Sequence, residues 1–199
     1  MVGIITWRRG WGSLRAAIAD RRALLIYAVA AVLLAVNWYV YIWAVGADRI
    51  LDASLGYFIN PLMNVVLGVA LLGERLRKGQ WLAIAVAASG VAYLTWNYGQ
   101  LPWVALVLAT TFAAYGVLKK KAPLPVEQGM MLETATLFLP ALAALLWLDW
   151  GGSGALFSGS WAMLLLLLLS GPITVIPLLM FAGAARVVPL STLGVLQYL

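Results

Sequence analysis

Few residues of this 199-residue chain can do chemistry, and they lie mostly within long apolar segments. The chain has no Cys and no His, which excludes disulfides, thiol catalysis, Cys/His metal sites and imidazole proton relays. The only carboxylate inside a predicted apolar segment is Glu133, followed by Thr134. An ionisable group in such surroundings suggests function, here proton exchange with a coupled substrate. The alternative is a first-turn Glu favoured by the helix dipole, within reach of Lys119–Lys121.

A second group consists of two amides beside a proline. Asn60 and Asn64 are one helical turn apart and therefore share a face, and Pro61 permits the helix to bend. This pattern indicates either a hinge beside a polar pocket or a simple kink whose amides hydrogen-bond to neighbouring helices. Asn37 and Tyr41, four residues apart, predict either a wall for an aromatic or amphipathic substrate or part of an interfacial aromatic belt.

The elements that must position these residues are membrane helices. The chain is 64% hydrophobic and 10% charged, whereas a soluble domain has about 25% charged residues. Its apolar runs are continuous and long enough to cross a bilayer, and only helices and closed barrels satisfy their backbone groups there. We therefore predict an all-α, polytopic transmembrane bundle with complete spans at 24–46, 53–72, 80–96, 102–118, 129–148 and 161–182, and a seventh span beginning near Leu190.

The distribution of Lys and Arg predicts the orientation of these spans. Twelve of the 13 basic residues fall in the N-terminal segment and in the loops that share its side, and only Arg49 lies on the other side. The positive-inside rule places the basic loops and the N-terminal segment in the cytoplasm. This bias explains the net charge of +6 without a nucleic-acid partner.

Two stretches of the chain repeat each other in opposite orientation. Residues 43–47 and 53–56 read WAVGA and ASLG, and residues 181–185 and 191–194 read FAGAA and STLG, at a constant offset of 138 positions. The matching spans lie five apart, and this odd separation reverses their direction. Inverted repeats are the architecture on which many secondary transporters alternate around a midplane site. Gln197 and Tyr198 lie near the repeat counterpart of Asn60, so we expect them to complete its pocket.

Several motifs carry a resemblance to a known family. They are Asn37–Val45, Ala53–Leu62, Leu72–Leu76, Gln80–Ala83, Leu118–Leu124, Leu132–Thr134 and Pro189–Tyr198. Together they resemble the EamA-type carriers of the drug/metabolite transporter superfamily, and within them the RarD branch. Glu74 resembles the Gly-Glu signature of that family, and we interpret it as structural, forming a loop ion pair and a helix stop.

The resemblance implies ten helices in two inverted five-helix repeats, with both termini cytoplasmic. Residues 1–98 would then hold part of helix two and helices three to five of the first repeat. Residues 99–199 would hold helices six to eight and part of helix nine. The abrupt apolar ends of the chain predict a fragment truncated at both ends. In this family the helix that corresponds to 80–96 lies near the dimer or repeat interface, which makes a homodimer one expected assembly.

We therefore expect a secondary transporter, or permease, of a small organic solute in the plasma (inner) membrane. Drug or metabolite efflux by alternating access, with or without proton coupling, is the mechanism that the resemblance implies. No Gly-Lys-Ser/Thr nucleotide motif is present, and we expect neither cofactor nor metal. One alternative is a truncated, non-transporting fragment or structural membrane protein. Another, a membrane enzyme acting on lipid, needs converging acids, bases or a metal that the sequence does not offer.

Overall fold

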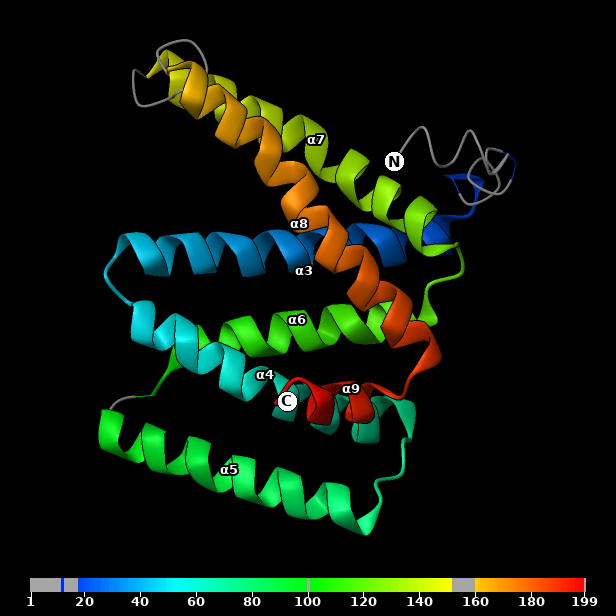
Figure 1. Ribbon diagram of the computed structural model, residues 1–199. Helices are drawn as coiled ribbons and strands as arrows, with labels where there is room; N and C mark the ends of the chain where they lie inside the picture. Colours follow the sequence, from blue (N-terminus) through cyan, green and yellow to red (C-terminus); the bar gives the residue numbers. More distant parts are fainter. Residues whose placement is uncertain (1–11, 13–17, 100, 152–159, 199) are drawn as a thin grey trace. The chain divides into compact units, whose positions relative to one another are not determined.

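The computed structural model describes residue 12 and residues 18–99, 101–151 and 160–198 (Figure 1). Within these ranges the chain is helical, as predicted, and each predicted apolar segment coincides with a helix. The helices are α3 (Arg21–Gly46), α4 (Ile50–Leu72), α5 (Lys78–Tyr98), α6 (Trp103–Lys121), α7 (Val126–Trp150), α8 (Trp161–Val187) and α9 (Leu190–Leu196).

Five of these helices, namely α3, α4, α6, α7 and α8, are long and apolar enough to cross a membrane. Helix α5 covers the predicted span 80–96 and is long enough, with 21 residues. Its mean hydropathy is too low for it to count among these five described helices. Its small and polar residues, such as Gly79, Gln80, Ser89 and Gly90, lower its mean hydropathy. Of the six predicted complete spans, five are therefore confirmed as helices that are long and apolar enough to cross a membrane, and the one at 80–96 is a helix of sufficient length that is less apolar.

The chain forms two compact units. One unit comprises Met1–Ala31 and Pro123–Gly183, and the other comprises Val32–Ala122 and Ala184–Leu199. The first contains the beginning of α3, helix α7 and most of α8. The second contains the rest of α3, helices α4, α5 and α6, the last turn of α8, and α9.

In the first unit, Tyr27 of α3 fixes the beginning of α7. Its ring is buried against Gly129, where an added Cβ would lie 2.6 Å from Tyr27 Cε1. Its hydroxyl accepts a hydrogen bond of 2.8 Å from the backbone N–H of Leu124. A glycine at position 129 is therefore required by the close approach of the tyrosine ring.

In the second unit, small residues let α4 pack closely against α6. An added Cβ at Gly56 would lie 3.2 Å from Leu108 Cβ and 3.4 Å from Ala105 Cα. The two neighbouring core clusters consist of Ala44, Ala53, Val104 and Leu108, and of Leu55, Ile59, Ala105 and Ala109. Between membrane helices, such small side chains permit the backbone approach on which van der Waals packing depends.

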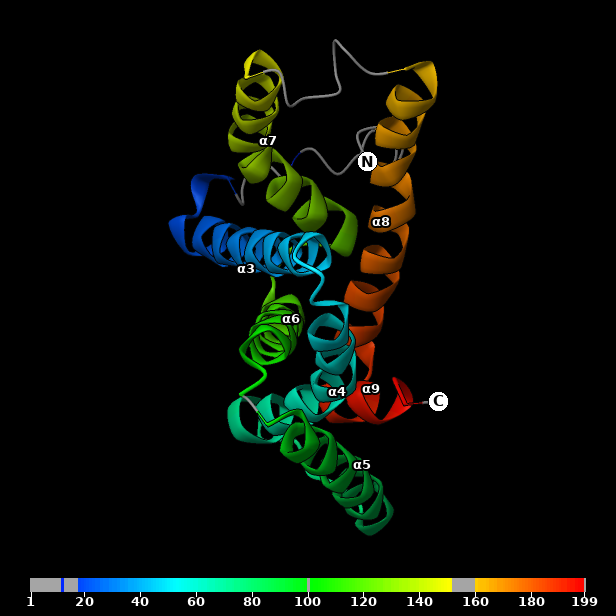
Figure 2. The ribbon, with the colours of Figure 1, turned by 90° about the vertical axis from the view of Figure 1, so that its left-hand side faces the viewer.

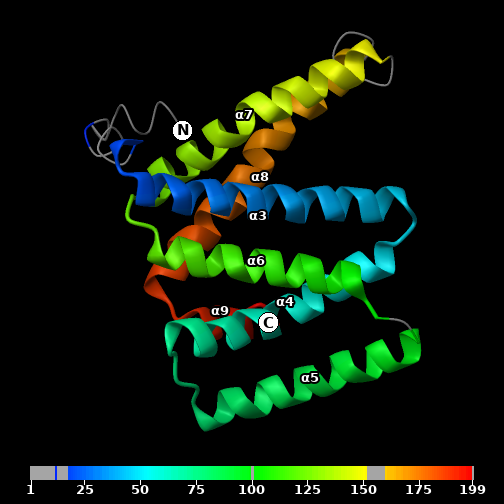
Figure 3. The same cartoon turned by 180° about the vertical axis from the view of Figure 1, so that it is seen from behind.

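Helix α4 also packs against α9, and the two lie side by side in two further views (Figures 2 and 3). Helix α4 ends at Gly73, whose φ of 66° is the left-handed conformation that glycine adopts without strain. The N–H groups of Gly73 and of Glu74 both donate to the carbonyl oxygen of Gly68. This tight turn brings Glu74 to the beginning of α9.

Candidate functional site

Asn60, Asn64 and Gln197 form an amide cluster where α4 meets the residues that follow α9. Asn64 is completely buried, and its Nδ2 donates a hydrogen bond of 3.0 Å to Gln197 Oε1. Asn60 Nδ2 lies 3.4 Å from the same oxygen. The Oδ1 atoms of both asparagines are buried, with no hydrogen-bond partner among the described residues. Because buried amide oxygens are normally paired, the cluster has two acceptors with capacity for the donors of a solute.

Pro61 lies within α4 at the level of this cluster. Proline has no N–H, so the carbonyl oxygen one turn earlier, that of Tyr57, loses its usual helical donor. Nearby, the hydroxyl of Tyr198 donates a hydrogen bond of 2.7 Å to the carbonyl oxygen of Phe58. Helix α4 therefore receives a hydrogen bond from the segment after α9 beside its proline.

Helix α9 approaches α4 closely at Gly194. An added Cβ there would lie 2.5 Å from the carbonyl oxygen of Pro61 and 3.2 Å from Asn64 Cβ. Other contacts join Gly68 to Ser191, Asn60 to Gln197 and Phe58 to Tyr198. Since partner numbers rise along α9 as they fall along α4, the two segments run antiparallel.

The structure thus brings together five of the nine residues that the sequence singled out: Asn60, Pro61, Asn64, Gln197 and Tyr198. The other four lie elsewhere. Asn37 Nδ2 donates to the carbonyl oxygen of Leu108 at 2.8 Å and to Thr111 Oγ1 at 2.9 Å. Tyr41 packs edge-on against Tyr57, with ring centroids 6.1 Å apart. Asn37 therefore joins α3 to α6, whereas Tyr41 contacts α4.

Glu133 and Thr134 belong to the first unit. Helix α7 begins at Val126, not at the predicted 129, so Glu133 lies about two turns from its beginning. The alternative interpretation of Glu133 as a first-turn residue is therefore wrong. Glu133 is only 1% exposed. Thr134 is exposed, and its hydroxyl donates to the carbonyl oxygen of Met130 at 2.8 Å.

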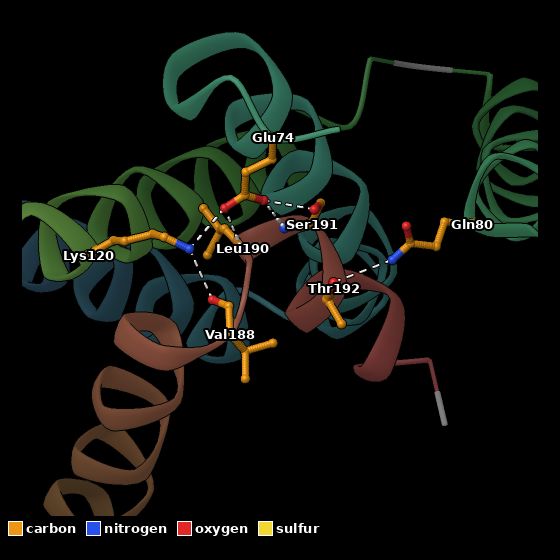
Figure 4. A network of polar contacts seen from close by, with 7 residues as sticks. All are labelled: Glu74, Gln80, Lys120, Val188, Leu190, Ser191 and Thr192. Carbon is orange, nitrogen blue, oxygen red and sulfur yellow. Dashed lines mark hydrogen bonds and ion pairs between the residues drawn. The ribbon is translucent and has the colours of Figure 1, made fainter. Parts of the chain in front are cut away.

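Glu74 holds together α9 and the ends of α4 and α6 (Figure 4). Its Oε1 accepts hydrogen bonds from Lys120 Nζ at 2.9 Å and from the Leu190 N–H at 2.8 Å. Its Oε2 accepts from the N–H and the hydroxyl of Ser191, at 2.8 and 2.7 Å. Lys120 Nζ also donates to the carbonyl oxygen of Val188 at 3.0 Å. The ion pair expected for Glu74 thus reaches across to α6, instead of staying within its own basic loop.

This carboxylate is held in its charged form. Burial raises the pKa of Glu74, but the hydrogen bonds from Ser191, Leu190 and Lys120 outweigh burial and leave the pKa below its ordinary value. Next to it, Gln80 Nε2 of α5 lies 3.3 Å from Thr192 Oγ1 of α9. Helix α9 is therefore tied by side chains to α4, α5 and α6.

Sequence reasoning missed Asp52 and the specific role of Lys120. Helix α4 begins at Ile50 and not at 53, so Asp52 lies inside its first turn and is 3% exposed. Glu133 is therefore not the only carboxylate within a span. The spacing of Arg49 and Asp52, three residues apart, is the signal by which the ion pair could have been found. No sequence signal distinguishes Lys120 from its neighbours Lys119 and Lys121.

The sequence has well-matched relatives. The model of the EamA-like transporter family matches residues 1–96. Protein RarD of Escherichia coli (strain K12) is 42% identical over 199 residues, which cover 100% of this chain and 67% of that protein. The chain belongs to the EamA-like transporter family. Within it the RarD branch is the match, because protein RarD of Streptomyces exfoliatus is 46% identical over 191 residues, or 96% of this chain.

This member of the EamA-like family spans 61% of the length of the Streptomyces exfoliatus relative. A more distant relative, the chloramphenicol-sensitive protein RarD of Pseudomonas aeruginosa, is 32% identical over 199 residues. No solved structure matches the chain significantly. With its apolar helices, membership of this family makes the chain a multi-pass protein of a membrane transporter family.

Proposed function

We propose that the protein is a secondary transporter that moves a small organic solute across the plasma membrane by alternating access. The observation that carries this proposal is the antiparallel contact of α4 with α9, with an amide cluster at the crossing. Family membership supports the reaction class, and the cluster supplies the polar contacts for a solute within an apolar surrounding.

The contact between α4 and α9 supports an inverted repeat. The repeat offset of 138 positions makes residue 198 the counterpart of Asn60. In the structure Asn60 contacts Gln197, one residue from that counterpart. Two antiparallel copies related by a two-fold axis approach each other most closely at equivalent positions. The amide cluster therefore lies where a two-fold axis between the copies would pass, which suits a site that each side reaches in turn.

The proposed solute site consists of Asn60, Asn64, Gln197 and Tyr198, with Pro61 as the hinge of α4. Asn37 and Tyr41 would act by holding α4 and α6 in place, because their described contacts are with those helices. Glu133 is the proposed proton-coupling group, and Thr134 lies beside it. If Glu133→Gln leaves both transport and its pH dependence unchanged, proton coupling through this residue is wrong.

Efflux as the direction of transport, a cytoplasmic N-terminal segment and a homodimer complete the proposal. Small residues of α5, such as Ala85 and Ser89, lie on exposed positions and suit close packing with another helix. Light scattering of the detergent-purified protein measures its mass and so tests the dimer.

Transport by the whole protein in proteoliposomes tests the function. Solutes that raise the melting temperature in a thermal-shift screen would be assayed for uptake and counterflow. We expect Asn64→Ala to reduce transport of an active solute by about tenfold or more, since buried polar contacts contribute about 1–3 kcal/mol. The matched control is Asn97→Ala, because Asn97 is an exposed amide whose described hydrogen bond lies within α5. Equal transport by the two variants would contradict the proposed site.

A further inference from the structure

The end of α4 opposite Glu74 carries a second charged group, the Arg49 cluster, which consists of Arg49, Asp52, Trp43 and Trp103. The guanidinium carbon of Arg49 lies 5.9 Å from the ring centroid of Trp43 and 5.8 Å from that of Trp103. The two rings lie 5.4 Å apart. A cation within about 6 Å of an aromatic ring is attracted by its negative face, so the two indoles form a cation-binding pair.

Asp52 is the buried carboxylate of this cluster. It is 3% exposed, and the next residue, Ala53, belongs to the apolar cluster of Ala44, Ala53, Val104 and Leu108. Its Oδ2 lies 3.5 Å from Arg49 Nε, and its Oδ1 is buried with no hydrogen-bond partner in the described part of the chain. A buried charge is costly when it is left incompletely paired.

Arg49 satisfies this carboxylate poorly. A guanidinium usually binds a carboxylate through two short hydrogen bonds of about 2.7–2.9 Å, whereas here the only described contact is single and 3.5 Å long. The Arg49 side chain is also 34% exposed. The cluster therefore has the chemistry of a cation site, and its present occupant contacts one of the two carboxylate oxygens, at 3.5 Å.

We propose that the Arg49 cluster is a binding site for an organic cation of the guanidinium or ammonium class, which displaces Arg49 from Asp52 and the two indoles. Arg49 acts as a tethered substitute that keeps the carboxylate paired when no solute is bound. The incoming cation donates to both oxygens of Asp52 and lies against Trp43 and Trp103. This site is separate from the amide cluster, and the inference rests on the proposed transport function, for which it names a solute class.

The test is equilibrium binding of radiolabelled N-ethylguanidinium to the whole purified protein. We expect saturable binding that Asp52→Asn weakens by about tenfold or more, as expected when a hydrogen bond to a charged group is lost. Arg49→Gln should tighten binding, because the competing cation is gone. Trp103→Ala should weaken it by about two- to fivefold, the loss expected for one cation–π contact. Arg75→Gln, at an exposed arginine beyond the other end of α4, should have no effect.

Two further arms make the result decisive. Neutral N-ethylurea should not bind, and each variant is first checked by size-exclusion chromatography. If Asp52→Asn does not fold, Arg49→Gln and Trp103→Ala carry the comparison. Nanodiscs with and without phosphatidylethanolamine distinguish the source of the cation. If that lipid competes with N-ethylguanidinium for the site, the natural ligand is a lipid headgroup. If it does not compete, the ligand is a free solute.

The proposal is overturned if the native protein shows no saturable binding of the cation, even when Arg49→Gln binds it. Arg49 and Asp52 would then be a permanent ion pair. Counterflow of the same probe separates this result from the transport function. Binding without counterflow leaves the site intact and contradicts carriage of this solute, whereas transport of other solutes without cation binding contradicts the site alone.

Discussion

At the scale of single residues, Glu74 shows how one carboxylate can organise the ends of three helices. Its two oxygens accept four hydrogen bonds, one from a lysine and three from the first turn of α9. Helix N-termini favour negative charge because their N–H groups point outward unpaired. The carboxylate is therefore stabilised by backbone and side chain together.

Replacing Lys120 should show how much its ion pair with Glu74 contributes to stability. We expect Lys120→Met to lower the free energy of unfolding by about 1–3 kcal/mol, because a charged hydrogen bond is lost. Lys121→Met is the matched control, since Lys121 is adjacent and exposed. Thermal unfolding in detergent measures both. Combining Lys120→Met with Glu74→Gln should give less than the sum of the single effects, and strict additivity would contradict the described contact.

The pH dependence of stability should also report on Glu74. Its pKa is lower in the folded protein than its ordinary value of 4.5. Its contribution to stability is therefore fully present above that value and is lost as the pH falls through the lowered pKa. The difference in melting temperature between the native protein and Glu74→Gln should shrink as the pH falls below about 4.5. A difference that stays constant or grows on acidification would argue against this role.

Some of the site residues could be predicted from the sequence and some could not. Asn60, Pro61 and Asn64 were identified because amides and a proline within an apolar run are rare and costly. Asp52 was missed because the predicted helix began three residues late, which placed its carboxylate outside the span. Lys120 was indistinguishable within a run of three lysines, since only tertiary structure decides which of them meets Glu74.

At the scale of elements, the contact between α4 and α9 depends on a missing side chain. We expect Gly194→Ala to destabilise the protein by about 1–3 kcal/mol, the cost of overpacking a close contact. The obstacle is the backbone oxygen of Pro61, which cannot turn aside as a side chain would. Gly90→Ala is the control, because nothing lies within 4 Å of an added Cβ there. Equal melting temperatures of the two variants would show that α4 and α9 do not pack this closely.

The helices themselves could be predicted because lipid leaves the backbone few alternatives, so that a long apolar run implies a helix. Their boundaries could not be predicted as well. Helices α4 and α7 each begin three residues earlier than expected, and those first turns contain Asp52 and Glu127. Charged residues beside an apolar run are easily assigned to the loop, although the N-terminus of a helix favours acidic side chains.

At the scale of the whole molecule, the orientation in the membrane is open to direct test. The chain has no native cysteine, so single cysteines can be introduced without background. We expect Gly79→Cys, in the first turn of α5, to react with a membrane-impermeant maleimide only in inside-out vesicles, because the loop just before it is basic. Ala47→Cys, in the turn between α3 and α4, should react only in right-side-out vesicles. Labelling of both from the same side would contradict the predicted topology.

The central claim is that the amide cluster between α4 and α9 is reached from each side of the membrane in turn. The most direct measurement is the accessibility of Gln197→Cys in the whole protein to a membrane-impermeant thiol reagent. Gln197 is exposed and contacts both asparagines of the cluster. Alternating access predicts labelling in right-side-out and in inside-out vesicles, with protection by a transported solute in both. Labelling from one side only, or from neither, would contradict the account.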